Sequence, residues 1–505
     1  MNIKVECDFP IGTLRFATGS FQDSSGNWDN RIVNVGRLDR NIAEDKYFET
    51  SGIDISFNDS DRYFRDMMNG TGRYIAGKQV RILKTDDTVL YVGTVRGWTF
   101  DKNSFSIFIS DKLGGIELKL TETIQANEYP DAVADSIGVD IPIIYGSLID
   151  TARKGAVRCW KTSTGKYLVA GHHCKAIVNV YEDDAEVSTG WTIENNIDGK
   201  CYVSYLTGTA DYININVQGS MNDSSVLIEE PIEAIMDLID NYTDMNYNSA
   251  SMTASETVMN ARNYEIGYMV TNETVEEFLS DFCYTFSADF FINENNEIAL
   301  SVANLFYTPI AIFNENSILK DSFSISEEPD EIKNKIKYMY DYNYIDYYYR
   351  KLPVLEQNKS IDNWGEFYDN ISLKSTTDLI TALDSANRLL IQKKNPKRKI
   401  IFSIPLSLGG NLQIGDIILV SHPDEISLLA EKYQVRRLQI YYSYDYINLE
   451  CIKMPAVGSS FILGDKTSLA STWNDADSAD REYGYLGDST TGFFDNEVDP
   501  AKVLS

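Results

Sequence analysis

The stretch Gly77-Lys78-Gln79-Val80-Arg81-Ile82-Leu83 alternates polar and apolar side chains. A period of two residues is typical of a strand that buries one face. Asp86-Asp87 then supplies a turn and Val89 to Val95 follows, which predicts a hairpin. Trp98 to Phe100 and Phe105 to Ile109 predict a second hairpin. The chain around this stretch is therefore expected to be mainly β structure.

Strands are also expected further along the chain. The run Ile141-Pro142-Ile143-Ile144-Tyr145-Gly146 contains a proline, which favours an edge strand or an extended docking segment over a helix. Residues 156–220 and 321–455 are predicted to be mainly strands. One good helix is expected within the second of these ranges, after the cap candidates Ser375 to Asp378. Its predicted buried stripe is Leu379, Leu383, Ala386 and Leu390.

Other segments carry helical signals. A short helical turn is expected at Asp61 to Met68, and Pro231 suits the first turn of a longer helix. Apolar residues with the spacing of one helix face follow at two places: Ile232, Ile235, Met236 and Ile239, and then Val275, Phe278, Leu279 and Phe282. With the strands expected at 289–293 and 297–302, residues 228–305 are predicted to form a small α+β domain.

The composition limits the class of protein. The 505 residues include 45 Lys and Arg against 75 Asp and Glu, a formal charge of −30. Such a charge repels nucleic acid and acidic membranes over the average surface. We expect no membrane span and no secretory signal. The six cysteines are scattered, so we expect reduced core residues, although a bridge among Cys159, Cys174 and Cys201 stays open.

The search for chemistry gives no candidate catalytic, cofactor-binding or metal-binding residues. His172 and His173 are adjacent, so on a strand they point to opposite faces, and His422 has no obvious partner. No phosphate-binding loop or nucleophile motif is present. The pairs Asp183-Asp184 and Glu327-Glu328 are predicted to be solvated turn residues. The sequence therefore predicts a protein that is not an enzyme and needs no cofactor.

One basic cluster stands out in this acidic chain: Lys393, Lys394, Lys397, Arg398 and Lys399. It follows the expected helix, where the helix dipole favours cations. Three interpretations stay open: a solvated helix end, a contact with an acidic neighbouring subunit, or a contact with nucleic acid.

Several segments in order resemble tail-tip or baseplate-hub proteins of long-tailed bacteriophages and gene transfer agents. They are Ile53 to Phe64 with Gly77 to Leu83 and Val92 to Val95, Ile141 to Gly146, Tyr167 to His173 with Asn179 to Asp184, Asn411 to Val420, and Tyr483 to Phe494. The resemblance implies a structural virion protein of the tail, made in the host cytoplasm, that forms a homotrimeric hub. Each subunit would contribute two related tube-like β-barrel domains, so that the hub adapts a sixfold tube to a threefold tip.

The resemblance also implies domain limits and partners. We expect a first tube-like barrel at 1–125, an inserted small β domain at 126–227, an α+β domain at 228–320, a second tube-like barrel at 321–456, and an extended arm at 457–505. The fold class is thus mainly β with α+β parts. The implied partners are the distal tail, tail tube and tape-measure proteins and tip fibre or spike proteins. DNA would pass through a channel without specific binding, repelled by acidic side chains.

Two other functions stay open. A receptor- or polysaccharide-binding tail protein would expose an aromatic platform, for instance at Trp160 and Trp191, although these tryptophans also suit core packing. A glycan hydrolase would need two carboxylates in a cleft, and no pair can be nominated.

Overall fold

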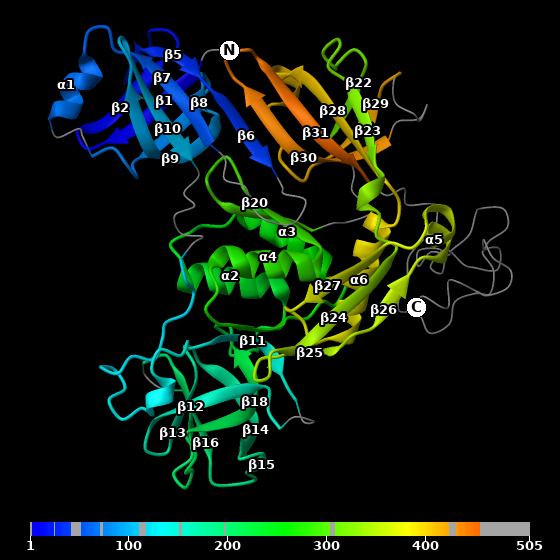
Figure 1. Ribbon diagram of the computed structural model, residues 1–505. Coiled ribbons are helices and arrows are strands. Elements are labelled where there is room, and N and C mark those ends of the chain that lie inside the picture. The colour runs from blue at the N-terminus through cyan, green and yellow to red at the C-terminus, as the bar shows by residue number, and fades with distance from the viewer. Residues whose placement is uncertain are drawn as a thin grey trace. The chain divides into compact units, whose positions relative to one another are not determined.

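The computed structural model describes residues 3–24, 26–41, 52–70, 74–110, 118–150, 154–195, 198–302, 309–423 and 431–454. The expected C-terminal arm at 457–505 lies outside these residues. Residues 3–302 and 309–453, where described, belong to one compact unit. The fold is mainly β with α+β parts, as the sequence predicts (Figure 1).

The largest sheet combines strands from both ends of the chain. Its N-terminal strands are β1 (Ile3–Phe9), β2 (Gly12–Ala17), β3 (Phe21–Asp23), β4 (Gly26–Asn30), β5 (Ile32–Val35), β6 (Arg37–Asn41), β7 (Gly52–Asn58), β8 (Gln79–Lys84), β9 (Val89–Phe100) and β10 (Ser104–Ser110). Its C-terminal strands are β22 (Ala311–Asn314), β23 (Ser324–Glu328), β28 (Lys397–Pro405), β29 (Ile417–Ser421), β30 (Glu431–Tyr441) and β31 (Tyr446–Lys453). The main path runs β23-β28-β31-β30-β6-β7-β10-β9-β8-β1-β2-β4-β3.

The hairpins expected around Gly77 to Leu83 are present, but their strands are longer. β9 is one strand of 12 residues that pairs with β8 through Val89 to Thr94 and with β10 through Thr94 to Phe100. The prediction of separate strands at Val89 to Val95 and Trp98 to Phe100 is therefore wrong. A β-bulge lets the strand continue, because the extra residue bends the strand without ending its pairing. The short helix α1 (Tyr63–Asn69) confirms the expected helical turn.

A second sheet holds the inserted β strands. It contains β11 (Ile143–Leu148), β12 (Val157–Ser163), β13 (Lys166–Ala170), β14 (Cys174–Glu182), β15 (Ala185–Glu186), β16 (Thr192–Asn195), β17 (Cys201–Ser204), β18 (Tyr212–Ser220) and β19 (Gly267–Val270). The segment expected at Ile141 to Gly146 as an edge strand or an extended docking segment is extended: β11 pairs with β19 through Ile143 to Gly146 and then with β18 through Ser147 and Leu148, so it also connects these two strands. Gly146 is required where the two meet, since its φ is +66° and a Cβ would lie 1.8 Å from the Ile266 carbonyl oxygen.

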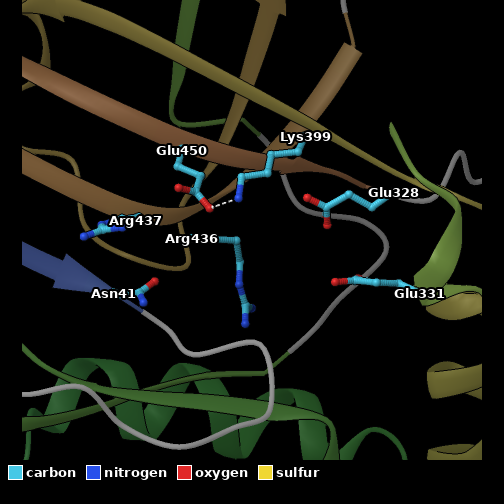
Figure 2. Close-up of a pocket in the computed structure, with 7 residues that line it drawn as sticks. All are labelled: Asn41, Glu328, Glu331, Lys399, Arg436, Arg437 and Glu450. Atoms are coloured by element: carbon cyan, nitrogen blue, oxygen red, sulfur yellow. Dashed lines mark ion pairs between the residues drawn. The ribbon is translucent and has the colours of Figure 1, made fainter. Parts of the chain in front are cut away.

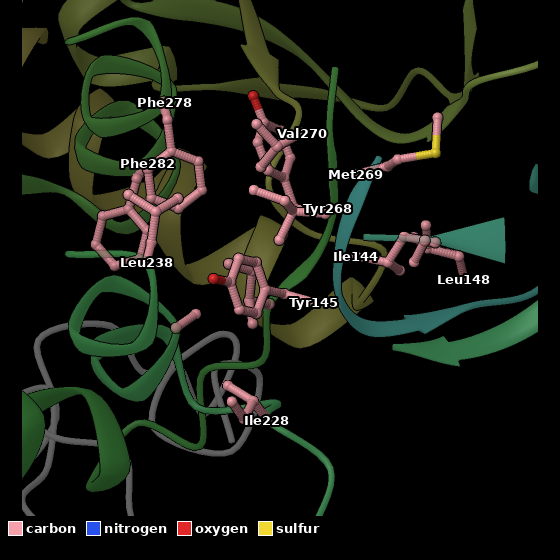
Figure 3. Close-up of a cluster of buried hydrophobic side chains, with 14 of the residues drawn as sticks. Ile144, Tyr145, Leu148, Ile228, Leu238, Tyr268, Met269, Val270, Phe278 and Phe282 are labelled. Carbon is pink, nitrogen blue, oxygen red and sulfur yellow. The ribbon is translucent and has the colours of Figure 1, made fainter. Parts of the chain in front are cut away.

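Three helices pack beside β11 and β19. They are α2 (Pro231–Tyr242), α3 (Ser249–Asn260) and α4 (Val275–Phe286), followed by the hairpin of β20 (Ala288–Ile292) and β21 (Ile298–Val302). The sequence predicts α2 and α4 correctly, and a capping box of Thr274 and Glu277 begins α4. Figure 3 shows the core they share, in which the rings of Tyr268 and Phe278 lie 5.5 Å apart. The single core therefore extends from the second sheet into the helices.

A third sheet is formed by β24 (Lys335–Asn343), β25 (Tyr348–Lys351), β26 (Val354–Glu356) and β27 (Tyr368–Leu373), with α5 (Asn358–Trp364) between β26 and β27 and α6 (Leu379–Lys393) packed against the sheet. Only two of the four residues predicted to be buried on α6 are buried. Ala386 and Leu390 are buried, but Leu379 and Leu383 are 54 % and 38 % exposed. The face of α6 that packs against the sheet carries small buried residues such as Ala382, which let the helix lie close to it. The two exposed leucines lie outside this face.

Strand pairing crosses the expected domain limits. β28 to β31 share a sheet with the N-terminal strands, whereas β24 to β27, also within 321–456, form their own sheet. This smaller sheet and its helix α6 contact α4, since β27 and α6 both lie against that helix. The limits themselves stay a prediction. The remaining short helix, α7 (Leu406–Gly409), follows β28.

Candidate assembly site

Two parts of the large sheet share one plan. We call β7, α1, β8, β9 and β10 the first β unit, and β28, α7, β29, β30 and β31 the second β unit. In each unit a strand, a short helix and three strands follow in the chain, and the pairing order is the same. β7-β10-β9-β8 corresponds to β28-β31-β30-β29, and every pair is antiparallel.

Matching glycines fix the start of the second strand of each unit. Gly77 and Gly415 precede β8 and β29, with φ of +75° and +87°. The Gly77 N–H donates to the Val95 carbonyl at 2.8 Å, and the Gly415 N–H donates to the Val435 carbonyl at 2.9 Å. Each valine N–H donates in turn to the residue after the glycine, at 2.9 Å in both units. Glycine adopts this conformation without strain, so the two sites have the same residue type, a similar φ and matching backbone hydrogen bonds.

A β-bulge follows at the equivalent place in both units. The register of β9 against β10 shifts at Arg96, and that of β30 against β31 shifts at Arg436. A bulge increases the local twist of a strand, so the two long strands bend at corresponding positions. Both bulged residues immediately follow the valine that bonds to the glycine.

The strand before each unit is also matched. β6 and β23 each have five residues and pair antiparallel with the first strand of their unit. The match ends at the next strand, since β1 is antiparallel to β8 whereas β22 is parallel to β29. The chain therefore contains two copies of a five-strand arrangement.

The two units are joined by strand pairing. β6 pairs antiparallel with β30, from Arg37 opposite Tyr441 to Asn41 opposite Arg437 (Figure 1). Asp39 accepts hydrogen bonds from Arg437 at 2.9 and 2.7 Å and from Gln439 at 2.9 Å. Partial burial opposes ionisation of Asp39, but the bonds from Arg437 and Gln439 outweigh it and hold its pKa below the ordinary value.

The sheet face opposite the apolar core carries polar side chains that bond to one another. Asn448 donates to Gln439 at 3.1 Å and Ser403 donates to Asn448 at 3.1 Å, which extends the row from Asp39 across β6, β30, β31 and β28. At the positions of Ser403 and Asn448, the first β unit has Ser56 and Ser106, whose hydroxyls lie 2.8 Å apart. This face therefore presents polar groups that already have partners.

The basic cluster lies at the edge of the second β unit and is largely neutralised within the chain. Figure 2 shows a pocket of about 290 Å³ in which Lys399 pairs with Glu450 at 2.5 Å. The other ion pairs of the cluster are Lys393 with Asp369 at 3.8 Å, Lys397 with Glu331 at 2.6 Å and Arg398 with Glu327 at 2.9 Å. Paired cations release few counterions on binding phosphate, so this geometry does not favour a nucleic-acid contact.

The side chains of His172 and His422 contribute to packing and hydrogen bonding within the fold. His172 is buried, accepts a hydrogen bond from the Ile144 N–H at Nε2 at 2.8 Å, and donates from Nδ1 to the His173 carbonyl at 3.0 Å. Burial lowers the pKa of His172 to about 4, so the ring is neutral. His422 stacks on Phe323 with ring centroids 4.1 Å apart. Within the described ranges, no group of His, Cys, Asp and Glu could hold a metal ion.

The tryptophans and cysteines also belong to the packing. Trp191 donates to the Val187 carbonyl at 2.8 Å and contacts the core, and Trp160 packs against a smaller cluster around Leu168 and Tyr202. They do not form one exposed platform. All six cysteines are free and buried, so the open bridge among Cys159, Cys174 and Cys201 is not formed. Among the described helices, none is long and apolar enough to cross a membrane.

Gly77 and Gly415 both lie in segments that the sequence singles out, but their equivalence was not predicted. Each glycine stands two residues before a short strand, and this shared position is a local signal of the duplication. Arg96 and Arg436 give no signal, because a bulge depends on the register of the partner strand.

Comparisons with known proteins complete the description. No family model matches the chain, and no curated protein matches it. Among solved structures, it is similar to the tail protein from Neisseria meningitidis MC58 (TM-score 0.43, 9 % identity, covering 90 % of this chain and 97 % of that one). It is also similar to the 43 kDa tail protein of prophage MuSo2 from Shewanella oneidensis (0.45, 9 %, 90 % and 99 %) and to a chain of a native gene transfer agent virion (0.43, 11 %, 70 % and 90 %).

Proposed function

We propose that this chain is a structural protein of a phage-like tail and forms a homotrimeric hub at the tail tip or baseplate. The observation that carries the proposal is the duplicated β unit. A chain with two equivalent units can present six of them in a threefold ring, which is the geometry needed between a sixfold tube and a threefold tip.

The hub would surround part of the DNA-ejection channel. The polar face of the large sheet supports this role, since its Arg437 and Lys399 are paired with carboxylates and offer little to phosphate. The net charge of −30 acts in the same direction. The partners would be the distal tail, tail tube and tape-measure proteins and tip fibre or spike proteins. The role is structural rather than catalytic.

Two measurements test the proposal. Light scattering of the purified full chain should give three times the mass of one chain. Electron-microscopic class averages should show a threefold ring with a central opening. A monomeric mass at every accessible concentration, or a ring of another symmetry, would overturn the hub.

A further inference from the structure

The two β units differ in how completely their long strands are paired. β30 has partners along both edges: β31 on one side, and β29 followed by β6 on the other. β9 is paired with β10 on one side, but on the other side β8 reaches only to Thr94. Beyond the bulge, Gly97–Phe100 has no strand partner on that side within the described part of the chain. This open edge is the counterpart of the edge that β6 covers on β30.

Exposure of side chains marks the same gap. Trp98 of β9 corresponds to Leu438 of β30, because each is the second residue after the bulge. Leu438 is 0 % exposed and belongs to the apolar core, whereas Trp98 is 42 % exposed. A large aromatic side chain is thus partly exposed on the unpaired part of β9, whereas the equivalent leucine, on the part of β30 that pairs with β6, is buried.

β23 is the counterpart of β6 for the second β unit. Within the described residues, only one of its two edges is paired with another strand. β23 pairs with β28 as β6 pairs with β7, and β23 ends the sheet. Its residues Ser324, Ser326 and Glu327 are exposed. An exposed edge strand is a template for pairing with another chain. The described part of the chain thus has one unpaired edge on β9, at Gly97–Phe100, and one unpaired edge on β23, the counterpart of the strand that covers the equivalent edge of β30.

We propose that β23 of one copy pairs antiparallel with Gly97–Phe100 of β9 in the next copy. The inference rests on the proposed function, since it gives the trimer its subunit contact. The register follows from β6 on β30, where Ile440 faces Leu38 and Gln439 faces Asp39. If β23 pairs with β9 in the register in which β6 pairs with β30, the new pairs are Trp98 with Glu327, Thr99 with Ser326, and Phe100 with Ile325 of the next copy.

This contact closes on itself. Each copy donates one β23 and receives one at β9, so three copies use all their edges in a head-to-tail ring. Around that ring, β6–β30 pairing within a chain alternates with β23–β9 pairing between chains. Phe100 and Ile325 would form an apolar cross-strand pair like that of Ile440 and Leu38. Directly opposite side chains of this kind stabilise the pairing of two strands.

A designed disulfide tests the register. Thr99→Cys and Ser326→Cys are placed together in the full chain, both at exposed positions. Directly opposite residues of antiparallel strands have Cα atoms about 4.5–5.5 Å apart, within reach of a disulfide. The control is Thr99→Cys with Ser324→Cys, which moves the second thiol by two residues, or about 7 Å, beyond that reach. Mild oxidation should leave the six buried native cysteines untouched.

The expected result is a reductant-sensitive covalent trimer from the first variant and at least tenfold less from the control. Mixing the two single variants should give a covalent heterodimer, which establishes that the bond joins different chains. A trimeric mass without the cross-link, or with equal cross-linking in the control, would overturn the β23–β9 pairing and leave the hub standing. A monomeric mass without cross-linking would overturn both.

Discussion

Arg437 and Asp39 are 398 residues apart in the sequence and form a two-pronged ion pair, with Nε–Oδ1 at 2.9 Å and Nη2–Oδ2 at 2.7 Å. The pair lies where the first and second β units meet through β6 and β30. Two parallel bonds between a guanidinium and a carboxylate fix orientation as well as distance. The junction between the units is thus held by a directional contact in addition to the backbone pairing.

We predict that Arg437 and Asp39 stabilise each other by about 0.5–1 kcal/mol, because both are partly exposed and solvent screens the pair. A double-mutant cycle of Arg437→Ala and Asp39→Ala in urea unfolding measures this coupling. The folded pKa of Asp39 is lowered, so its contribution is present above the unfolded pKa of about 4 and is lost as pH falls through the folded value. A coupling that does not weaken between pH 7 and pH 2.5 would contradict the assignment.

The two positive-φ glycines should respond differently to alanine. A Cβ at Gly77 meets nothing within 4 Å, so Gly77→Ala should cost only backbone strain, about 1–2 kcal/mol. A Cβ at Gly415 would lie 3.2 Å from the Ser301 Cβ, so Gly415→Ala should cost more. Gly52→Ala is the matched control, since Gly52 has no positive φ and its nearest contact is 3.6 Å. Thermal unfolding of the three variants ranks them, and equal losses for Gly77→Ala and Gly52→Ala would refute the strain argument.

Local patterns predicted the elements and the hairpins of neighbouring strands, but not the pairing of strands that are far apart in the chain. The strand and two of the helices were predicted because the repeat of apolar residues lies within one short stretch of sequence. These stretches are Gly77 to Leu83, Ile232 to Ile239 and Val275 to Phe282. α3 was missed because its Ser- and Thr-rich sequence buries only Met252, Ser255 and Met259 and has little amphipathic signal. The junction of β6 with β30 could not be predicted, because no residue near Asp39 encodes the position of Arg437. Pairing across hundreds of residues is set by tertiary packing, as is the choice of buried face on α6.

His172 should make stability fall as the solution becomes acidic. Its pKa is about 4 in the folded chain against 6.5 when unfolded, so the unfolded state binds more protons between these values. The difference corresponds to about 3 kcal/mol lost between pH 7 and pH 4. His172→Gln keeps an acceptor for the Ile144 N–H and should flatten this dependence. His173→Gln, at the exposed neighbouring position, should leave it unchanged. Urea unfolding at several pH values makes the comparison, and identical pH profiles for both variants would count against a buried neutral ring.

Arg350 of β25 joins the third sheet to the segment that directly follows β11 of the second sheet. Its guanidinium pairs with Asp150 at 2.9 Å, contacts Asp341, and donates to the Ile149 carbonyl at 3.2 and 3.1 Å. Asp150 is 2 % exposed, and burial raises the pKa of Asp341 while Arg350 opposes that rise. Removing one partner leaves buried carboxylates uncompensated, which costs about 3–5 kcal/mol.

We therefore expect Arg350→Ala to destabilise the region around β24 and β25 strongly. Hydrogen exchange measures this locally, which matters because a chain of several sheets need not unfold in one step. Lys351→Ala is the matched control at the exposed neighbouring position. Adding Asp150→Asn to Arg350→Ala should recover part of the protection, since one buried charge is then removed. If Arg350→Ala exchanges no faster than Lys351→Ala, the ion pair does not hold the two sheets together.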